Sequence, residues 1–150
     1  MIITSIYKGI LFAERLHAQW AAYLDLAGIH WEYLGEDNFQ VFLECVHTEC
    51  CFDRSKPIEH ILNVTIVPYA DSEQVQEHYN RLFSSNHYDD PSPAVFGATP
   101  LTVYWIMLHG AGGGAHTELG WGEASGSHKS LLDHWKKAYE KVEFGISEVK

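Results

Sequence analysis

The chain has few cysteines, no long apolar run and no leader-like N-terminus, and each absence excludes a class of protein. Three cysteines among 150 residues are an odd number, which argues against a scaffold held together by disulfide bonds. The longest apolar run, Leu101–Leu108, is too short to cross a membrane. The N-terminal residues MIITSIYKG lack the basic, apolar and small-residue regions of a secretory signal peptide. We therefore expect a cytoplasmic protein with no membrane association.

Basic residues are also scarce, because the chain has 20 acidic and 10 basic residues and a formal net charge of -10. Between Pro57 and His128 the only base is Arg81. The acids of the same segment are Glu59, Asp71, Glu73, Glu77, Asp89, Asp90, Glu118 and Glu123. Since affinity for nucleic acid comes mainly from Lys and Arg at phosphates, direct nucleic-acid binding is not expected. An acidic surface suits a basic protein partner, or it serves solubility alone.

The local patterns that are present predict a single α/β domain over residues 1–150. Apolar residues at helical spacing predict helices over 12–27 and 130–142, and a third helix follows Asp71, which is expected to cap it. Alternating or β-branched segments predict strands over 2–11, 29–34, 39–46, 60–69 and 101–109. Polar, proline-rich or glycine-rich segments predict loops over 47–57, 84–100 and 110–126. The expected architecture is a mixed sheet of four to five strands with flanking helices.

Three N-terminal segments resemble the start of small phage-borne proteins of the PD-(D/E)XK nuclease-like superfamily. They are Ser5–Ile10 (SIYKGI), Arg15–Ala21 (RLHAQWA) and Leu26–Tyr33 (LAGIHWEY). Proteins of this superfamily begin with a YKGI-type strand, a helix of RLEARWA type and a strand of LGIxWEYE type. The resemblance covers roughly the first 34 residues. It implies an α-β-β-β-α-β core.

The resemblance implies nuclease activity only where the acids that hold a Mg²⁺ ion and a lysine near the scissile phosphate are present. Carried over position by position, the helix glutamate corresponds to His17. The glutamate and the lysine of the E-x-K pair correspond to Thr65 and Val67. Because Thr and Val cannot supply the charge that a hard cation needs, we expect a nuclease-like fold without nuclease chemistry and without a cofactor.

Two other groups of residues have the chemistry of metal ligands. A divergent divalent-metal-dependent nuclease would use the shifted acids Glu14, Glu32 and Glu44. Zinc prefers thiolate and imidazole ligands, and such side chains lie close together in the sequence at Cys45, His47, Cys50 and Cys51. Their spacing lacks the paired C-x2-C knuckles of a zinc ribbon. The glycines of 110–116 imitate a dinucleotide fingerprint, but no helical pattern follows them.

Charged and aromatic residues form the remaining candidate site, because aromatic anchors among charges are typical of protein interfaces. The candidate partner-binding residues are Asp71, Glu73, Glu77, Tyr88, Asp89, Asp90, Glu118, Trp121 and Glu123. Phe96 is expected in the same loops. The hypothesis is a non-catalytic phage or mobile-element protein that binds and inhibits a host nucleic-acid-targeting defence protein, as an anti-CRISPR-type mimic of nucleic acid. The alternatives are the divergent nuclease and a structural protein that forms a homodimer or larger homo-oligomer.

Overall fold

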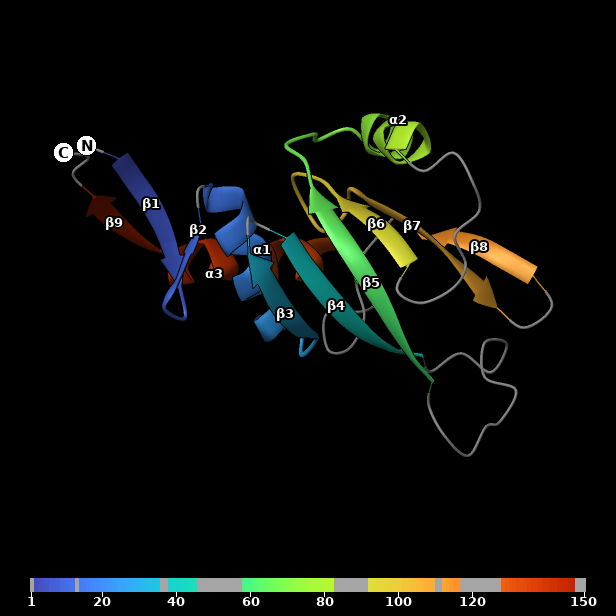
Figure 1. Ribbon diagram of the computed structural model, residues 1–150, viewed down its shortest axis with the longest axis horizontal. Coiled ribbons are helices and arrows are strands. Elements are labelled where there is room, and N and C mark those ends of the chain that lie inside the picture. Colours follow the sequence, from blue (N-terminus) through green and yellow to red (C-terminus); the bar gives the residue numbers. More distant parts are fainter. Residues whose placement is uncertain are drawn as a thin grey trace.

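A six-stranded mixed sheet forms the centre of the chain in a computed structural model (Figure 1). Its strands, in spatial as well as chain order, are β3 (His30–Gly35), β4 (Asn38–Cys45), β5 (Ile58–Ile66), β6 (Ser92–Phe96), β7 (Val103–His109) and β8 (Gly112–His116). A second sheet has the order β2-β1-β9, formed by β1 (Ile2–Tyr7), β2 (Ile10–Phe12) and β9 (Glu143–Ser147). The structure describes residues 2–12, 14–35, 38–45, 58–82, 92–109, 112–116 and 128–147.

Helix α2 (Ser72–Leu82) connects β5 to β6, the one parallel pair among the described strands. The other described pairings are antiparallel. A parallel pair needs a crossover connection, and α2 supplies it. The prediction of an α/β domain with a mixed sheet and flanking helices is therefore confirmed. This sheet has six strands instead of the four to five expected, because β6 and β8 lie where the sequence predicts loops.

The helices cover both faces of the six-stranded sheet (Figure 1). Helices α1 (Arg15–Leu26) and α3 (His128–Lys141) pack against one face, and α2 packs against the other. Along β6, Ala94 and Phe96 belong to the large core with α1 and α3, whereas Val95 belongs to a smaller apolar cluster under α2. The middle of the sheet is thus buried on both sides, which accounts for its continuous apolar runs. None of the described helices is long and apolar enough to span a membrane.

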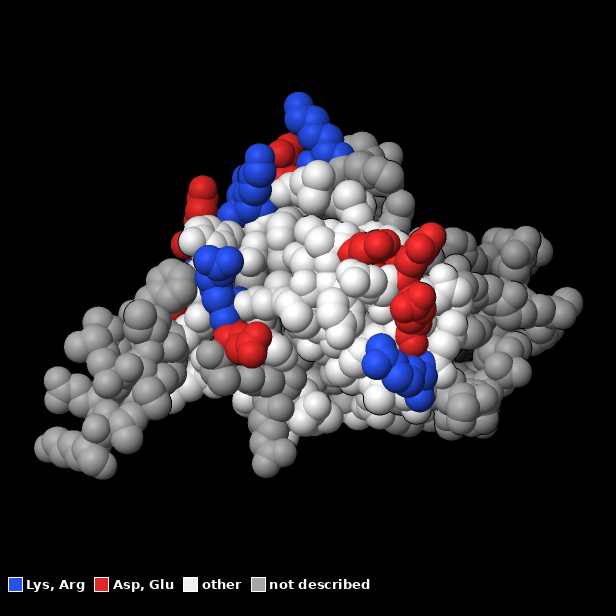
Figure 2. Space-filling view, turned by 90° about the horizontal axis from the view of Figure 1, so that it is seen from above, with Lys and Arg blue, Asp and Glu red and all other residues white. Residues whose placement is uncertain are grey.

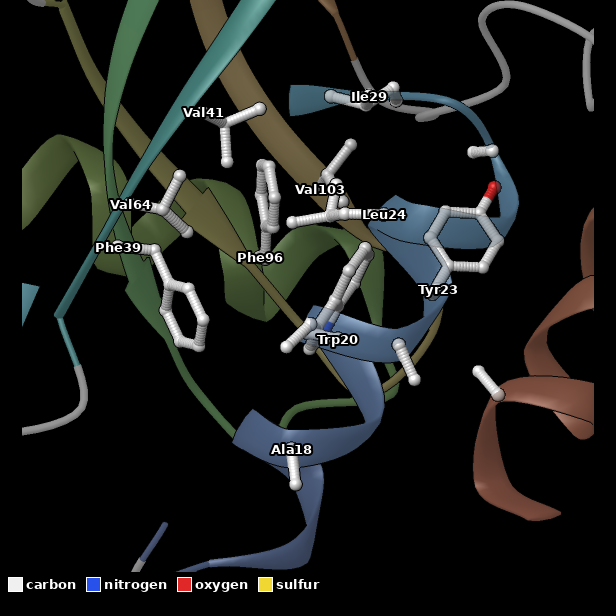
Figure 3. Close-up of a cluster of buried hydrophobic side chains, with 14 of the residues drawn as sticks. Ala18, Trp20, Tyr23, Leu24, Ile29, Phe39, Val41, Val64, Phe96 and Val103 are labelled. Atoms are coloured by element: carbon white, nitrogen blue, oxygen red, sulfur yellow. The ribbon is translucent and has the colours of Figure 1, made fainter. Parts of the chain in front are cut away.

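Trp20 of α1 lies at the centre of the large core and is 0% exposed. Figure 3 shows its ring projecting from α1 among side chains of the sheet, which include Phe96 and Val103. The centroid of the ring lies 4.7 Å from that of Phe96 and 4.9 Å from that of Trp135 on α3. The indole N–H also donates a hydrogen bond of 2.8 Å to the carbonyl of Gly97. A single side chain therefore joins α1 to the sheet, to α3 and to the segment after β6.

The end of α1 follows the local sequence closely. Gly28 has a φ of 74°, a left-handed value that favours glycine, at the position directly after the helix cap. Its N–H donates to the carbonyl of Asp25 at 3.1 Å, and the N–H of Ile29 donates to that of Leu24 at 2.8 Å. This pair of bonds is the Schellman arrangement, and it satisfies carbonyls that the helix leaves without a partner. The predicted end of this helix at residue 27 is confirmed, because Ala27 is the helix cap.

Two strands, β6 and β8, lie where the sequence predicts loops, and a third, β9, lies where it predicts no element. Strand β6 lies within the segment 84–100, and its Phe96, expected in an exposed loop, is 0% exposed. Its five residues include Pro93, and proline in a short run is typical of loops and sheet edges. Strand β8 is rich in glycine, which has a low strand propensity, and it forms by pairing with β7. Strand β9 pairs with β1 from the opposite end of the chain. For β6 and β9 a strand distant in sequence supplies a pairing partner, whereas for β8 the pairing with the neighbouring β7 outweighs the low strand propensity of glycine.

The turn between β1 and β2 positions charged and aromatic groups around Asp25 of α1. Lys8 and Gly9 have φ values of 50° and 76°, positive at both central residues as in a type I′ hairpin turn. The Lys8 ammonium lies 2.9 Å from the Asp25 carboxylate. The Tyr7 hydroxyl and the Trp31 indole N–H donate to the same carboxylate, at 2.6 Å and 2.9 Å. Asp25 therefore joins the small sheet and β3 to α1.

These contacts shift the protonation equilibria of the groups involved. Burial by itself raises the pKa of the Asp25 carboxyl, but the hydrogen bonds from Tyr7, Lys8 and Trp31 and the Lys8 charge outweigh it. The net result is a pKa below the ordinary value. Burial, together with the hydrogen bond to Asp25, raises the pKa of the Tyr7 hydroxyl. The carboxylate is thus the form that the fold favours.

The substitution Asp25→Asn is expected to lower the free energy of unfolding by about 1–3 kcal/mol at neutral pH, because it replaces charge-assisted hydrogen bonds. A carboxyl whose folded pKa is depressed stabilises the fold above its unfolded pKa of about 3.9, and this contribution is lost as the pH falls through the folded pKa. The difference between Asp25→Asn and wild type should therefore narrow under acidic conditions. Urea unfolding at neutral and acidic pH measures it, with the exposed Asp133→Asn as control. A difference that stays constant across the pH range would contradict the assignment.

Candidate functional site

His17, Thr65 and Val67 are the residues that the resemblance places at the nuclease motif. They lie on opposite faces of the sheet. The His17 ring stacks on Phe39, with centroids 6.4 Å apart, on the face covered by α1. Val67 is 6% exposed and belongs to the apolar cluster under α2. Thr65 pairs in register with Val95, which belongs to the same α2 cluster. The position that corresponds to the lysine of the E-x-K pair is therefore an apolar core position in this chain.

The alternative metal-binding acids lie at the start of α1 and on two neighbouring strands. Glu14 directly precedes α1 and is exposed. Glu32 is exposed on β3, where its carboxylate lies 3.6 Å from the His30 ring. Glu44 pairs in backbone register with Glu59 between β4 and β5. In the part of the chain that the structure describes, no three His, Cys, Asp or Glu residues come together in a group that would hold a metal ion.

Of the four zinc candidates, Cys45 lies within the described residues and the other three do not. Cys45 ends β4, where its backbone pairs with that of Ile58. His47, Cys50 and Cys51 lie outside the described residues. The zinc hypothesis therefore remains a prediction from the sequence.

The described part of the glycine-rich segment differs from a dinucleotide-binding fingerprint. Gly112–His116 form strand β8, and no phosphate-binding helix begins within them.

Three of the candidate partner-binding acids lie together on α2, and we call them the α2 acids: Asp71, Glu73 and Glu77. The Asp71 carboxylate accepts a hydrogen bond of 2.9 Å from the N–H of Glu73, which confirms Asp71 as the helix cap. All three acids are exposed, whereas Val75 and Tyr79 of the same helix are buried against the sheet. Figure 2 looks onto α2 and shows red acidic side chains grouped over it, beside blue basic atoms.

The other candidate partner-binding residues cannot be placed beside them. Tyr88, Asp89, Asp90, Glu118, Trp121 and Glu123 all lie outside the described residues. Their assignment remains a prediction from the sequence. Of the candidate partner-binding residues, the α2 acids are thus the ones that lie in the described part of the chain.

A cleft of about 700 Å³ lies between the N-terminal end of α1, the C-terminal half of α3 and the ends of two strands. We call it the α1–α3 cleft. It is lined by Arg15, Leu16, Gln19, Pro68, Ala98, Trp135, Lys136, Tyr139 and Glu140. Its volume falls within the range of small-molecule sites, about 300–1,000 Å³.

The carboxyl ends of the parallel strands β5 and β6 form one wall of the α1–α3 cleft. Pro68 follows β5 by two residues, and Ala98 follows β6 by two residues. Backbone pairing continues past both strands, because Val67 N–H donates to Phe96 and Ala98 N–H donates to Tyr69, each at 2.8 Å. Open α/β sheets bind ligands in crevices outside the carboxyl ends of their strands. This wall has that position in the fold, and its backbone is held in place by hydrogen bonds.

The opposite wall joins α1 to α3 through polar contacts. The Arg15 guanidinium stacks over the Tyr139 ring at 4.6 Å and donates to its hydroxyl at 3.3 Å. Gln19 is 6% exposed, and its carboxamide N–H donates to the carbonyl of Trp135 at 3.1 Å. Arg15 and Lys136 bring two cations to the cleft, and Glu140 brings one carboxylate. The lining is therefore net positive in a chain whose net charge is strongly negative.

Sequence reasoning did not find the α1–α3 cleft. Its lining comes from four separate segments, which only the fold brings together. The available signal was chemical, since Arg15 and Lys136 belong to a small basic minority of the chain.

Comparison of the chain with protein-family models, with curated proteins and with solved structures finds no significant match in any of the three. The structure defines the chain as an α/β protein with a crossover helix, an exposed acidic face on that helix and a positively charged cleft on the other side of the sheet. The two candidate functional surfaces are therefore the acidic face of α2 and the α1–α3 cleft.

The substitution Gly97→Ala is expected to destabilise the wall of the α1–α3 cleft. A Cβ at this position would lie 2.6 Å from the carbonyl oxygens of both Thr102 and Tyr69, so the backbone would have to shift. Overpacking of this kind costs about 1–3 kcal/mol, and urea unfolding should show that loss. The matched control is Gln76→Ala, an exposed position in the middle of α2, which should leave the unfolding midpoint nearly unchanged. A Gly97→Ala variant as stable as wild type would show that the close approach is not a constraint.

Proposed function

We propose that the protein acts by binding a basic protein partner through the α2 acids, and not by metal-dependent cleavage of nucleic acid. The observation that carries this proposal is the exposed acidic face of a helix whose opposite face is buried. The resemblance to phage-borne proteins suggests the class of partner, a host defence component whose basic groove handles nucleic acid. The α2 acids would occupy such a groove in place of phosphates.

The distribution of charge supports an interface over a uniform coat that serves solubility. On α2 and its cap, three acids accompany one base, Arg81. On α3, which covers the other face of the sheet, four exposed lysines accompany two acids. The lysines are Lys129, Lys136, Lys137 and Lys141. In Figure 2 the charged side chains over α2 are mostly red, whereas blue ones predominate at another part of the surface, with red ones among them. The described charges are therefore unevenly distributed, which favours orientation toward a charged partner.

Packing under α2 supports a rigid interface. Val75 is 0% exposed and Tyr79 is 3% exposed, and the Tyr79 ring contacts that of Tyr104 on β7 with centroids 4.9 Å apart. The helix is therefore fixed on the sheet while its acids remain in solvent. An interface that is already ordered loses less conformational entropy on binding.

The apolar environment of Val67 supports a non-catalytic role. This is the position that corresponds to the catalytic lysine in the resemblance, and here it packs with Val75 and Val95. A charged side chain at this place would require a rearrangement of the cluster. Binding is therefore the function that these residues favour over hydrolysis.

Neutralising the α2 acids is expected to weaken partner binding by about tenfold or more, since each exposed charge contributes up to about 1 kcal/mol. The variant combines Asp71→Asn, Glu73→Gln and Glu77→Gln, and asparagine preserves the helix cap. Tagged wild type and variant are incubated with nuclease-treated host lysate at about 50 mM and about 500 mM salt, and retained proteins are identified by mass spectrometry. A basic protein should be retained by wild type at the lower salt and lost with the variant.

The matched control removes three exposed acids elsewhere, through Glu32→Gln, Asp133→Asn and Glu143→Gln. It changes the net charge equally, and it should retain the same basic protein as wild type. Identical retention by the α2 variant and wild type would contradict the proposal. Cleavage of nucleic acid that needs a divalent cation and is abolished by Glu44→Ala would establish the alternative nuclease.

A further inference from the structure

We infer that the α1–α3 cleft binds a small organic anion whose charge is carried on a planar apolar body. The inference is independent of the proposed interface, because α2 covers the other face of the sheet. It rests on three features of the cleft, namely two cationic side chains, an apolar wall and a lining held in place by hydrogen bonds.

The cations indicate an anionic ligand. Among the described residues, neither Arg15 nor Lys136 lies within ion-pair distance of a carboxylate, although Glu140 also lines the cleft. In a chain with 20 acidic and 10 basic residues, two such cations at one concave site are unlike the surface as a whole. A guanidinium and an ammonium that line the same cleft can hold a carboxylate, sulfonate or phosphate through charge-assisted hydrogen bonds.

The contact with Tyr139 prepares Arg15 for this role. Its guanidinium lies over the ring at 4.6 Å and gives one of its donors to the hydroxyl at 3.3 Å. A guanidinium has five N–H donors, so this bond fixes the group and leaves others for a ligand. A side chain that is ordered before binding loses less entropy when the ligand arrives.

The rest of the lining indicates a planar apolar body. The apolar side chains of the lining are Leu16, Pro68, Ala98 and Trp135. Ligand sites are usually concave and mostly apolar, with a few polar groups that fix orientation. The volume of about 700 Å³ suits a small molecule with one or two fused rings.

A pair of fluorescent probes tests the inference, since they share a ring system and differ in charge. The anionic probe is 1-anilinonaphthalene-8-sulfonate, and the neutral probe is N-phenyl-1-naphthylamine. Titration of the full chain should show one saturable site for the anionic probe. Lys136→Gln and Arg15→Gln should each weaken its affinity by about tenfold, with little change in the affinity for the neutral probe.

Lys137→Gln provides the matched control, because it removes a neighbouring exposed lysine of α3 that does not line the cleft. Its affinity for the anionic probe should equal that of wild type, as should the affinity of the variant without the α2 acids. Lys136 is exposed, so Lys136→Gln keeps the test decisive even where Arg15→Gln loosens the α1–α3 contact. The inference is overturned by the absence of one-site saturation, by affinities of Arg15→Gln and Lys136→Gln equal to wild type, or by an equal loss in Lys137→Gln.

Discussion

The hydrogen bond from the Trp20 indole to the Gly97 carbonyl, at 2.8 Å, joins the central helix to the segment that follows β6. Because the indole is fully buried, its N–H needs a partner inside the protein, and the carbonyl supplies it. The ring also packs against Phe96 of the sheet and Trp135 of α3. Gly97 itself packs closely against the carbonyl oxygens of Thr102 and Tyr69, which a Cβ at this position would approach to 2.6 Å. The relative positions of α1, α3 and the strand ends, and with them the α1–α3 cleft, follow from this contact.

The crossover through α2 gives the protein two chemically different sides. A parallel connection from β5 to β6 has to leave the sheet and return, which places α2 on the face opposite α1 and α3. The acids of α2 and the basic groups at the α1–α3 cleft are thereby separated by the sheet. The two proposed surfaces are therefore consequences of one connection.

Local features were the most predictable part of the fold. The cap at Asp71, the stop at Gly28 and the apolar faces of the helices depend on neighbours within a few residues, so the sequence predicts them well. Strand β6 was missed because its parallel partner β5 is distant in sequence and Pro93 favours a loop. For the candidate sites, the sequence predicted the exposed α2 acids and not the cleft. A helix face is a local pattern, whereas a cleft requires the relative placement of whole elements.

By itself the sequence determined the α/β class, the helix ends and the acidic character. Each of these follows from residue type and short-range spacing. Only the tertiary structure decided that Val67 is a core position and that Arg15 and Lys136 line one cleft. The physical reason is that burial and proximity arise from packing between segments far apart in the chain. No local periodicity encodes that α1, α3 and the ends of two strands will line the same cleft.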